Sequence, residues 1–238
     1  MRTYLKDSYL SKLLTPAIKV GPENRKVVVE KTIIYPGGGG QPLDRAWIEI
    51  NGSRYMVNDV KENSQGYFTI QVAGILPDKI ESVKQIIDWK YRYQNMRYHT
   101  LLHLISGYLY NKYRALATSS AIEPDHARLE VKFPEDKVPL NLDGELLTNN
   151  IKKLVNENLN VVSEEMERKK LGSEDLIRTY TNLIPKTVQK VRLVKIEDVD
   201  EQACGGTHVA KTGEIGDFKF VQIKNKGRLK KRMKMVID

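Results

Sequence analysis

The sequence predicts an α+β protein built from two parts, a small β-barrel-like domain and an α+β domain with an antiparallel sheet. The first 85 or so residues contain short runs rich in β-branched residues, separated by Gly, Asn and Pro. The remainder contains two long segments whose apolar residues recur at helical spacing, with strand-like segments between and after them. A chain of 238 residues suits one large domain or two modest ones. The pattern changes within 85–94, so we place the domains at 1–88 and 89–238.

Three segments of the first domain are typical of strands. Residues 26–34 (KVVVEKTII) are dense in β-branched side chains. Residues 47–60 read as a hairpin that turns at Asn51-Gly52, a pair suited to the positive φ angles of a tight turn. Residues 66–74 follow a polar turn. Short strands at this spacing favour a small barrel or a sandwich.

The second domain is predicted to contain two helices, at 95–113 and 142–159. Each helix has an apolar stripe, formed by Leu101, Leu104, Ile105, Tyr108 and Leu109 in the first and by Leu146, Leu147, Ile151, Leu154 and Val155 in the second. Residues 126–133 alternate like a strand between them. Three further strands are expected at 160–166, 187–197 and 214–224. The result is a largely antiparallel sheet with helices.

The composition favours a polyanionic partner. The formal net charge is +9, and residues 224–234 (KNKGRLKKRMK) carry seven basic side chains in eleven. Neutralised phosphates release counterions, so such a surface attracts RNA or DNA, although a basic run can also be a solvated terminal strand. One cysteine fits a reducing compartment, and no apolar run is long enough to span a membrane. We expect a cytoplasmic protein with no membrane partner, and the sequence does not predict its oligomeric state.

Two pairs of side chains suit a metal ion. His99 and His103 stand one helical turn apart and share a helix face, an arrangement that also arises from packing. Cys204 and His208, in ACGGTHV, offer a thiolate and an imidazole, and Gly205 and Gly206 would let the backbone fold back. Together the pairs use the only cysteine and three of the four histidines. Sulfur with nitrogen at tetrahedral geometry favours Zn²⁺, so we predict one zinc per chain.

The role of the zinc stays open at this stage. Four protein ligands usually close a zinc site, which then positions other groups, whereas a catalytic zinc keeps a position for water. The remaining histidine, His126, begins a predicted strand, and we expect it at the surface or in packing.

A second candidate site is the glycine-rich segment YPGGGGQPLDRAW at 35–47. Four consecutive glycines let main-chain amides approach a ligand, although the segment can also be a flexible loop between strands. It is not a P-loop, because no Gly-Lys-Ser/Thr follows. The predicted ligand-binding residues are Gly37, Gly38, Gly39, Gly40, Gln41 and Asp44.

These motifs together resemble the editing domain of alanyl-tRNA synthetase and its free-standing relatives, the AlaX-type proteins. The resemblance rests on MRYHTLLHL, ACGGTHVAKTGEIG and YPGGGGQPLD and runs from Tyr35 to about Met233. The editing domain of threonyl-tRNA synthetase shares the two metal-binding pairs, but the glycine-rich loop favours the alanyl branch. The length is similar to that of the medium-length AlaX form. Two positions depart from the family: Ala46 and Ser119 stand where glycine is usual.

The resemblance implies a trans-editing hydrolase that deacylates Ser-tRNA(Ala), and Gly-tRNA(Ala), at the 3′-terminal adenosine. It assigns His99, His103, Cys204 and His208 to the metal, with a catalytic role for the first three through that metal. Thr118 and Ser120 would offer hydroxyls to the substrate or else cap a turn. The partner would be the acceptor stem and 3′ end of tRNA(Ala), with binding assigned to the basic residues Lys224, Lys226, Arg228, Lys230, Lys231 and Arg232.

Two alternatives remain from the sequence. The first keeps the hydrolase but changes the substrate to another mischarged tRNA, as in threonyl-type editing. The second is a non-catalytic tRNA-binding module in which zinc only stabilises the fold.

Overall fold

The structure is a computed structural model, and it describes residues 1–238 except 22, 140–141, 171–175, 177 and 181–188. The chain forms two compact units. The first comprises Met1–Gly38 and Pro42–Asn95, and the second comprises Gly39–Gln41 and Met96–Asp238. Three residues of the glycine-rich loop therefore group with the second unit, although the chain on both sides of them belongs to the first. The predicted domain boundary between residues 88 and 89 stays a prediction.

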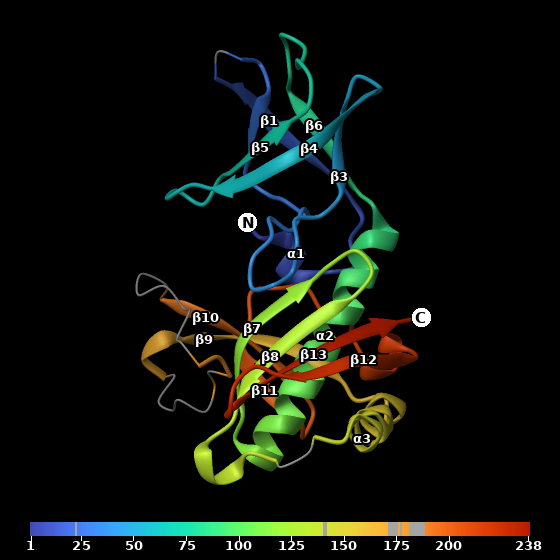
Figure 1. Cartoon of the computed structure of the whole chain (residues 1–238). Helices are drawn as coiled ribbons and strands as arrows, with labels where there is room; N and C mark the ends of the chain where they lie inside the picture. Colours follow the sequence, from blue (N-terminus) through green and yellow to red (C-terminus); the bar gives the residue numbers. More distant parts are fainter. Residues whose placement is uncertain (22, 140–141, 171–175, 177, 181–188) are drawn as a thin grey trace. The chain divides into compact units, whose positions relative to one another are not determined.

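Six strands of the first unit close into an antiparallel barrel (Figure 1). They are β1 (Lys12–Val20), β2 (Lys26–Val29), β3 (Ala46–Ile50), β4 (Ser53–Glu62), β5 (Phe68–Val72) and β6 (Ser82–Ile87), and a short helix α1 (Thr3–Lys6) precedes them. The strand order around the barrel is β1-β2-β5-β4-β3-β6, and β6 pairs back onto β1. Alternate residues such as Val27, Ile48 and Ile70 are fully buried inside it. The predicted barrel is confirmed.

The strand predicted over 26–34 ends early, at Val29. Beyond it, buried side chains replace the missing strand partner: Gln85 Oε1 accepts hydrogen bonds from Thr32 Oγ1 (2.8 Å) and from the Ile33 amide (3.2 Å). Strands β1 and β6 were not predicted. Strand β6 buries three residues in a row, so its sequence lacks the alternation that reveals a half-buried strand.

Helix α2 (Trp89–Tyr113) begins six residues before the predicted start at residue 95. Asp88 precedes its first residue, and the Tyr91 amide donates a hydrogen bond to Asp88 Oδ1 (3.1 Å), as at a helix N-terminus. Residues of α2 up to Asn95 group with the first unit and the remainder with the second. Four of the five residues of the predicted apolar stripe, Leu101, Leu104, Ile105 and Leu109, are fully buried, and Tyr108 is partly buried against the same core.

The second unit contains two antiparallel sheets, which confirms the α+β class. The four-stranded sheet has the order β12 (Phe218–Asn225), β13 (Lys230–Ile237), β8 (Ala127–Lys132) and β7 (Leu116–Ile122). The three-stranded sheet has the order β11 (Asp200–Ala203), β10 (Lys190–Ile196) and β9 (Val161–Glu167). The strand predicted over 187–197 corresponds to β10, and its first two residues lie outside the described residues. Strands β7 and β11 were not predicted.

The inner face of the four-stranded sheet packs with α2 and with α3 (Gly144–Asn156) in one hydrophobic core. Asp143 caps α3, because its side chain accepts hydrogen bonds from the amides of Glu145 and Leu146. The apolar stripe of α3 is narrower than predicted: Leu147, Ile151 and Val155 are buried, whereas Leu146 is 54% exposed. In the described part of this unit, short 3₁₀ turns lie at Glu135–Lys137, Arg168–Lys170 and Thr212–Ile215.

Within the described part of the chain, no helix is both long and apolar enough to cross a membrane.

Candidate metal centre

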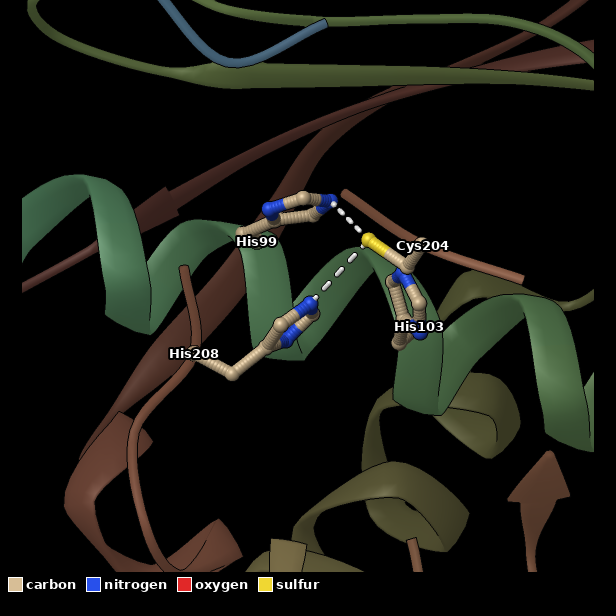
Figure 2. A group of neighbouring side chains, drawn as sticks. All are labelled: His99, His103, Cys204 and His208. Atoms are coloured by element: carbon tan, nitrogen blue, oxygen red, sulfur yellow. Dashed lines mark hydrogen bonds between the residues drawn. The ribbon is translucent and has the colours of Figure 1, made fainter. Parts of the chain in front are cut away.

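Four side chains of the second unit converge as the sequence predicts. His99 and His103 extend from adjacent turns of α2, and Cys204 and His208 come from the segment after β11 (Figure 2). One ligand atom from each residue lies within 4.8 Å of the other three. Cys204 Sγ lies 3.6 Å from His99 Nε2 and 3.4 Å from His208 Nε2.

These distances suit a tetrahedral ion. Zinc bound to sulfur at about 2.3 Å and to nitrogen at about 2.0–2.1 Å separates the two donor atoms by about 3.6 Å. The three histidines are 5–7% exposed, and Cys204 is half-buried. The cluster can therefore hold a metal ion that is largely shielded from solvent. Cys204 is the most exposed of its four candidate ligands.

Gly206 has a different role from the predicted one. Neither Gly205 nor Gly206 adopts a positive φ angle, so backbone freedom does not explain them. Instead, the His99 ring lies against Gly206: a Cβ there would be 2.1 Å from His99 Cε1. Arg192 of β10 holds this segment, because its Nη1 donates hydrogen bonds to the carbonyls of Cys204 (2.9 Å) and Gly206 (3.0 Å).

His99 is oriented by Gln41. His99 Nδ1 lies 3.0 Å from Gln41 Oε1, and the same oxygen accepts the Thr207 amide at 3.0 Å. The other end of the amide, Gln41 Nε2, donates to Thr207 Oγ1 at 2.8 Å. Because an amide oxygen only accepts, His99 must donate from Nδ1, which leaves the lone pair of Nε2 directed at Cys204.

His208 is oriented by Thr100, which lies on α2 between the two helical histidines. The Thr100 hydroxyl donates to the Met96 carbonyl (2.9 Å) and accepts the Val209 amide (3.2 Å). A hydroxyl has one proton, so its contact with His208 Nδ1 at 3.2 Å makes the imidazole the donor. His208 Nε2 is then also free to bind a metal ion.

His103 faces a buried carboxylate. His103 Nδ1 lies 3.4 Å from Asp200 Oδ2, which also accepts Gln202 Nε2 at 2.6 Å. The other oxygen, Oδ1, accepts Arg178 Nε at 3.2 Å. A Cβ at Gly107 would lie 2.6 Å from Asp200 Cβ, so glycine one turn beyond His103 permits this close approach. Each of the three imidazoles thus has an oxygen atom behind the ring, as metal-binding histidines usually do.

The electrostatics of the cluster favour a thiolate at Cys204 and a neutral imidazole at His208. Burial opposes ionisation of Cys204, but the three histidines outweigh it and hold the pKa of the thiol well below its usual value. Burial also disfavours a charge on His103, but the Cys204 thiolate and Asp200 raise its pKa to about 9. Burial, together with His99 and His103, keeps the pKa of His208 well below its usual value. A thiolate beside imidazoles is the donor set that binds zinc.

The glycine-rich loop reaches this centre through its last residues. The Gly40 carbonyl accepts the Ile122 amide (2.8 Å), and the Ser120 hydroxyl donates to the Gly39 carbonyl (3.4 Å). Gly40 has φ +88°, and a Cβ there would lie 2.5 Å from Ser120 Oγ. Only glycine fits both the angle and the space. Within the second unit, the structure therefore brings together Gly39, Gly40, Gln41, Ser120 and the four-residue His/Cys cluster.

The other predicted residues of the loop belong to the first unit. Tyr35 Oη donates to the Gly38 carbonyl at 2.9 Å, and Gly37 packs against the Leu43 amide. Asp44 is fully buried, accepts the Tyr35 amide (2.6 Å) and forms an ion pair with Arg92. Its carboxylate holds the base of the loop, and its predicted substrate contact stays a prediction.

Other sequence features fall outside the cluster. Thr118 Oγ1 donates to Glu130 Oε1 (3.0 Å), so its hydroxyl already has a protein partner. His126 Nδ1 contacts Asp125 Oδ1 at 2.7 Å, and His126 is not one of the four converging side chains. Ala46 is the buried first residue of β3 and does not have a positive φ, so alanine fits where glycine is usual in the family. Ser119, the other departure, follows a bulge in β7.

The predicted tRNA-binding run does not form one surface. Lys230 and Arg232 point away from the core, but Lys231 between them is only 7% exposed and donates to Asn225 Oδ1 (2.9 Å). Lys226 and Arg228 lie at the turn between β12 and β13, where Arg228 pairs with Glu135 (2.7 Å). The alternation of strand β13 thus splits a run that is continuous in sequence.

Comparison with known proteins agrees with these motifs. Residues 191–235 match the family model described as the threonyl and alanyl tRNA synthetase second additional domain. The chain is 32% identical to alanyl-tRNA editing protein AlaX-M of Saccharolobus solfataricus, over 97% of this chain and 95% of the relative. It is 37% identical to AlaX-L of Pyrococcus horikoshii over 95% of this chain but only 55% of that relative. It is 29% identical to alanine--tRNA ligase of Aeropyrum pernix, of which it covers 22%.

The chain thus spans nearly all of an AlaX-M protein, about half of an AlaX-L protein and under a quarter of a ligase. The resemblance drawn from the sequence motifs is confirmed. The chain belongs to the AlaX family of alanyl-tRNA editing proteins.

Proposed function

We propose that this chain is a trans-editing hydrolase. It removes serine, and glycine, from mischarged tRNA(Ala) by hydrolysing the ester at the 3′-terminal adenosine. The observation that carries the proposal is the convergence of the four donor side chains with Gln41 of the glycine-rich loop. Membership in the AlaX family supports the choice of tRNA(Ala).

The metal in the proposal is zinc, held by His99, His103, Cys204 and His208. The donor set, the sulfur–nitrogen distances and the partners behind each imidazole support this ion. When bound, zinc supplies a fixed positive charge that polarises or positions oxygen atoms of the acyl end. In this proposal His99, His103 and Cys204 have their catalytic role through that charge.

Main-chain and side-chain groups of the protein itself position the ester and the attacking water. An aminoacyl ester is already activated, so its hydrolysis needs an oriented water and stabilisation of developing negative charge more than a strong nucleophile. Gly39, Gly40 and Ser120 place main-chain groups and a hydroxyl next to Gln41, at the metal cluster. We assign them to the 3′ adenosine and the acyl group, and we keep Gly37, Gly38, Asp44 and Thr118 as further candidates.

Selectivity follows from the same polar groups. A pocket that hydrogen-bonds the serine hydroxyl leaves buried polar groups unpaired when alanine is bound, which disfavours alanine strongly. The correctly charged Ala-tRNA(Ala) is then spared.

The test is deacylation of Ser-, Gly- and Ala-tRNA(Ala), and of mischarged tRNA(Thr), by the wild-type protein and by Cys204→Ala, with the zinc content of both measured by atomic emission. We expect one zinc per wild-type chain, rapid loss of serine, retention of alanine and no turnover by the variant. Binding of tRNA without hydrolysis would instead favour the zinc-stabilised binding module. Hydrolysis of mischarged tRNA(Thr) alone would favour threonyl-type editing.

A further inference from the structure

The outer face of the four-stranded sheet carries a regular array of cations. In β13, Lys231, Met233 and Met235 are buried against the core. Since side chains alternate along a strand, Lys230, Arg232 and Lys234 project from the opposite face. The side chains of Lys230 and Arg232 are 42% and 35% exposed.

The register of the neighbouring strands extends this array. Arg232 stands opposite Lys224 on one side and Glu130 on the other, and Lys234 stands opposite Gln222 and Arg128. Directly opposed residues share a face of an antiparallel sheet. The outer positions of β8, β12 and β13 hold seven cations and one acid, the cations being Arg128, Lys132, Lys219, Lys224, Lys230, Arg232 and Lys234.

Glu130 is the single acid among these outer positions. It holds Arg232 and Lys230 in place and does not neutralise the positive charge of the array. Its Oε2 accepts hydrogen bonds from Nε (3.1 Å) and Nη2 (2.9 Å) of Arg232, and Lys230 Nζ lies 3.9 Å from Oε1. Arg128 also lies 3.8 Å from Glu123, so seven positive charges face two negative ones and the face keeps a positive excess of five. Fixed cations at strand spacing are suited to a polyanion with regularly spaced charges.

The array has a direction relative to the proposed site. At the start of β8, Ala127 pairs with Ile122, whose amide donates to the Gly40 carbonyl (2.8 Å). At its end, five residues later, Lys132 pairs with Lys230, about 17 Å away at the usual rise of a strand. The cations therefore extend from the glycine-rich loop outward along the sheet.

We propose that this outer face, defined by the seven cations above, is the docking surface for the sugar–phosphate backbone of the tRNA acceptor stem. The inference rests on the proposed function and names how its substrate is held. A-form RNA presents phosphates and 2′-hydroxyls and is bound mainly through shape and backbone contacts, which lysine and arginine supply. A stem that lies along β8 has its 3′ end at the loop. Buried Lys231 is excluded from this surface, and Arg128, Lys132, Lys219 and Lys234 are added to it.

A matched pair of variants tests the surface. The first, Lys219→Gln/Lys224→Gln/Lys234→Gln, removes three outer-face lysines. The control, Lys153→Gln/Lys190→Gln/Lys195→Gln, removes three exposed lysines from α3 and β10, so both variants change the net charge from +9 to +6. Affinity for uncharged tRNA(Ala) is measured by fluorescence anisotropy across a series of salt concentrations, because uncharged tRNA makes binding independent of hydrolysis.

We expect the outer-face variant to bind tRNA at least tenfold more weakly. The slope of log affinity against log salt should fall by about 2–3, at roughly one per lost phosphate contact, while the control changes it by less than one. In deacylation of Ser-tRNA(Ala), the outer-face variant should raise KM and retain kcat. Thermal unfolding compares the folding of the two variants.

Equal losses in both variants would show that tRNA responds only to net charge and would overturn the docking surface. Unchanged tRNA affinity in the outer-face variant would also overturn it. So would a variant that binds phosphatidylserine vesicles more weakly but binds tRNA as well as the wild type. Absence of hydrolysis by the wild type would refute the proposed function alone, since the binding comparison uses tRNA with no acyl group.

Discussion

Gln41 Oε1 lies 3.0 Å from His99 Nδ1, so a residue of the glycine-rich loop fixes the orientation of a predicted metal ligand fifty-eight positions away. The same oxygen accepts the Thr207 amide, which lies next to His208. One side-chain amide thereby joins the three sequence motifs that identify the family.

Gln41→Ala should lower zinc affinity by roughly 10- to 100-fold, because the His99 ring loses the acceptor that fixes its Nδ1 proton. Competition with a chromophoric chelator measures the change. Thr207→Val is the control: it removes the acceptor of Gln41 Nε2 but leaves the His99 contact, and its effect should be several-fold smaller. Equal losses in both variants would contradict a specific role for the His99 contact.

Asp200→Asn should also lower zinc affinity by roughly 10-fold or more. The substitution keeps the shape, but an amide cannot accept hydrogen bonds at both ends, whereas Asp200 accepts from Arg178 and Gln202 while facing His103. Glu201→Gln makes the same chemical change at the next residue, which is only half-buried, and should leave zinc affinity within twofold. Wild-type zinc affinity in Asp200→Asn would show that His103 is oriented without the carboxylate.

Gly40→Ala should reduce deacylation strongly, by at least tenfold in kcat/KM. The added Cβ meets Ser120 Oγ at 2.5 Å and Ser120 O at 2.7 Å, on top of a φ of +88°, so the loop must shift away from Gln41. Gly39→Ala has φ +57° and open space around its Cβ, so only the backbone strain of about 1–2 kcal/mol applies. A larger loss in Gly39→Ala than in Gly40→Ala would contradict the steric account.

Arg92→Met should destabilise the protein by roughly 3–5 kcal/mol, because it leaves the fully buried Asp44 carboxylate without its charge partner. Arg92 also donates to the carbonyls of Ser8 and Ile33, which lose those bonds. The double variant Asp44→Leu/Arg92→Met should lose less stability than the sum of the single changes. Denaturation in urea, followed by circular dichroism, measures all three, and strict additivity would refute the coupling.

Removal of metal with 1,10-phenanthroline should abolish deacylation and lower the melting temperature. A ligand present at one hundred times its dissociation constant stabilises the folded state by about 2.7 kcal/mol, which corresponds to roughly 5–10 °C for a chain of this size. Added zinc should restore both properties, and added Mg²⁺ should restore neither. Full activity in protein shown to contain no metal would exclude the proposed role of the cluster.

The sequence predicts the convergence of His99, His103, Cys204 and His208 and the fold class well, because both leave local signals. The HxxxH pair on a helix and the CxxxH pair in a loop are recognised by the spacing of their residues. The short strands of the barrel are recognised by the alternation of their side chains. The partners behind the imidazoles leave no such signal. Thr100 stands between the two helical histidines and Asp200 four residues before Cys204, but nothing in their own neighbourhood distinguishes them from packing residues.

The roles of residues that depend on tertiary contacts cannot be predicted from the sequence either. Gly206 looks like a flexible hinge in sequence, whereas in the structure it provides space for the His99 ring. Gln41 and Asp44, three residues apart, look like equivalent donors and acceptors at one loop. They belong to different units: Gln41 contacts His99, and Asp44 forms the buried pair with Arg92. Strand β6, buried on both faces, is missed because its burial is continuous.

The grouping of Gly39–Gln41 with the second unit limits how the two units can be exchanged in evolution or in engineered proteins. A tripeptide encoded within the barrel sequence completes the hydrogen bonds around a predicted metal ligand that is encoded far downstream. The two halves are therefore not freely interchangeable modules: a barrel grafted from another protein, or a truncation that starts at α2, would remove Gln41 even though every predicted metal ligand is retained. Such a chimera would keep the complete four-residue signature and still bind its ion weakly.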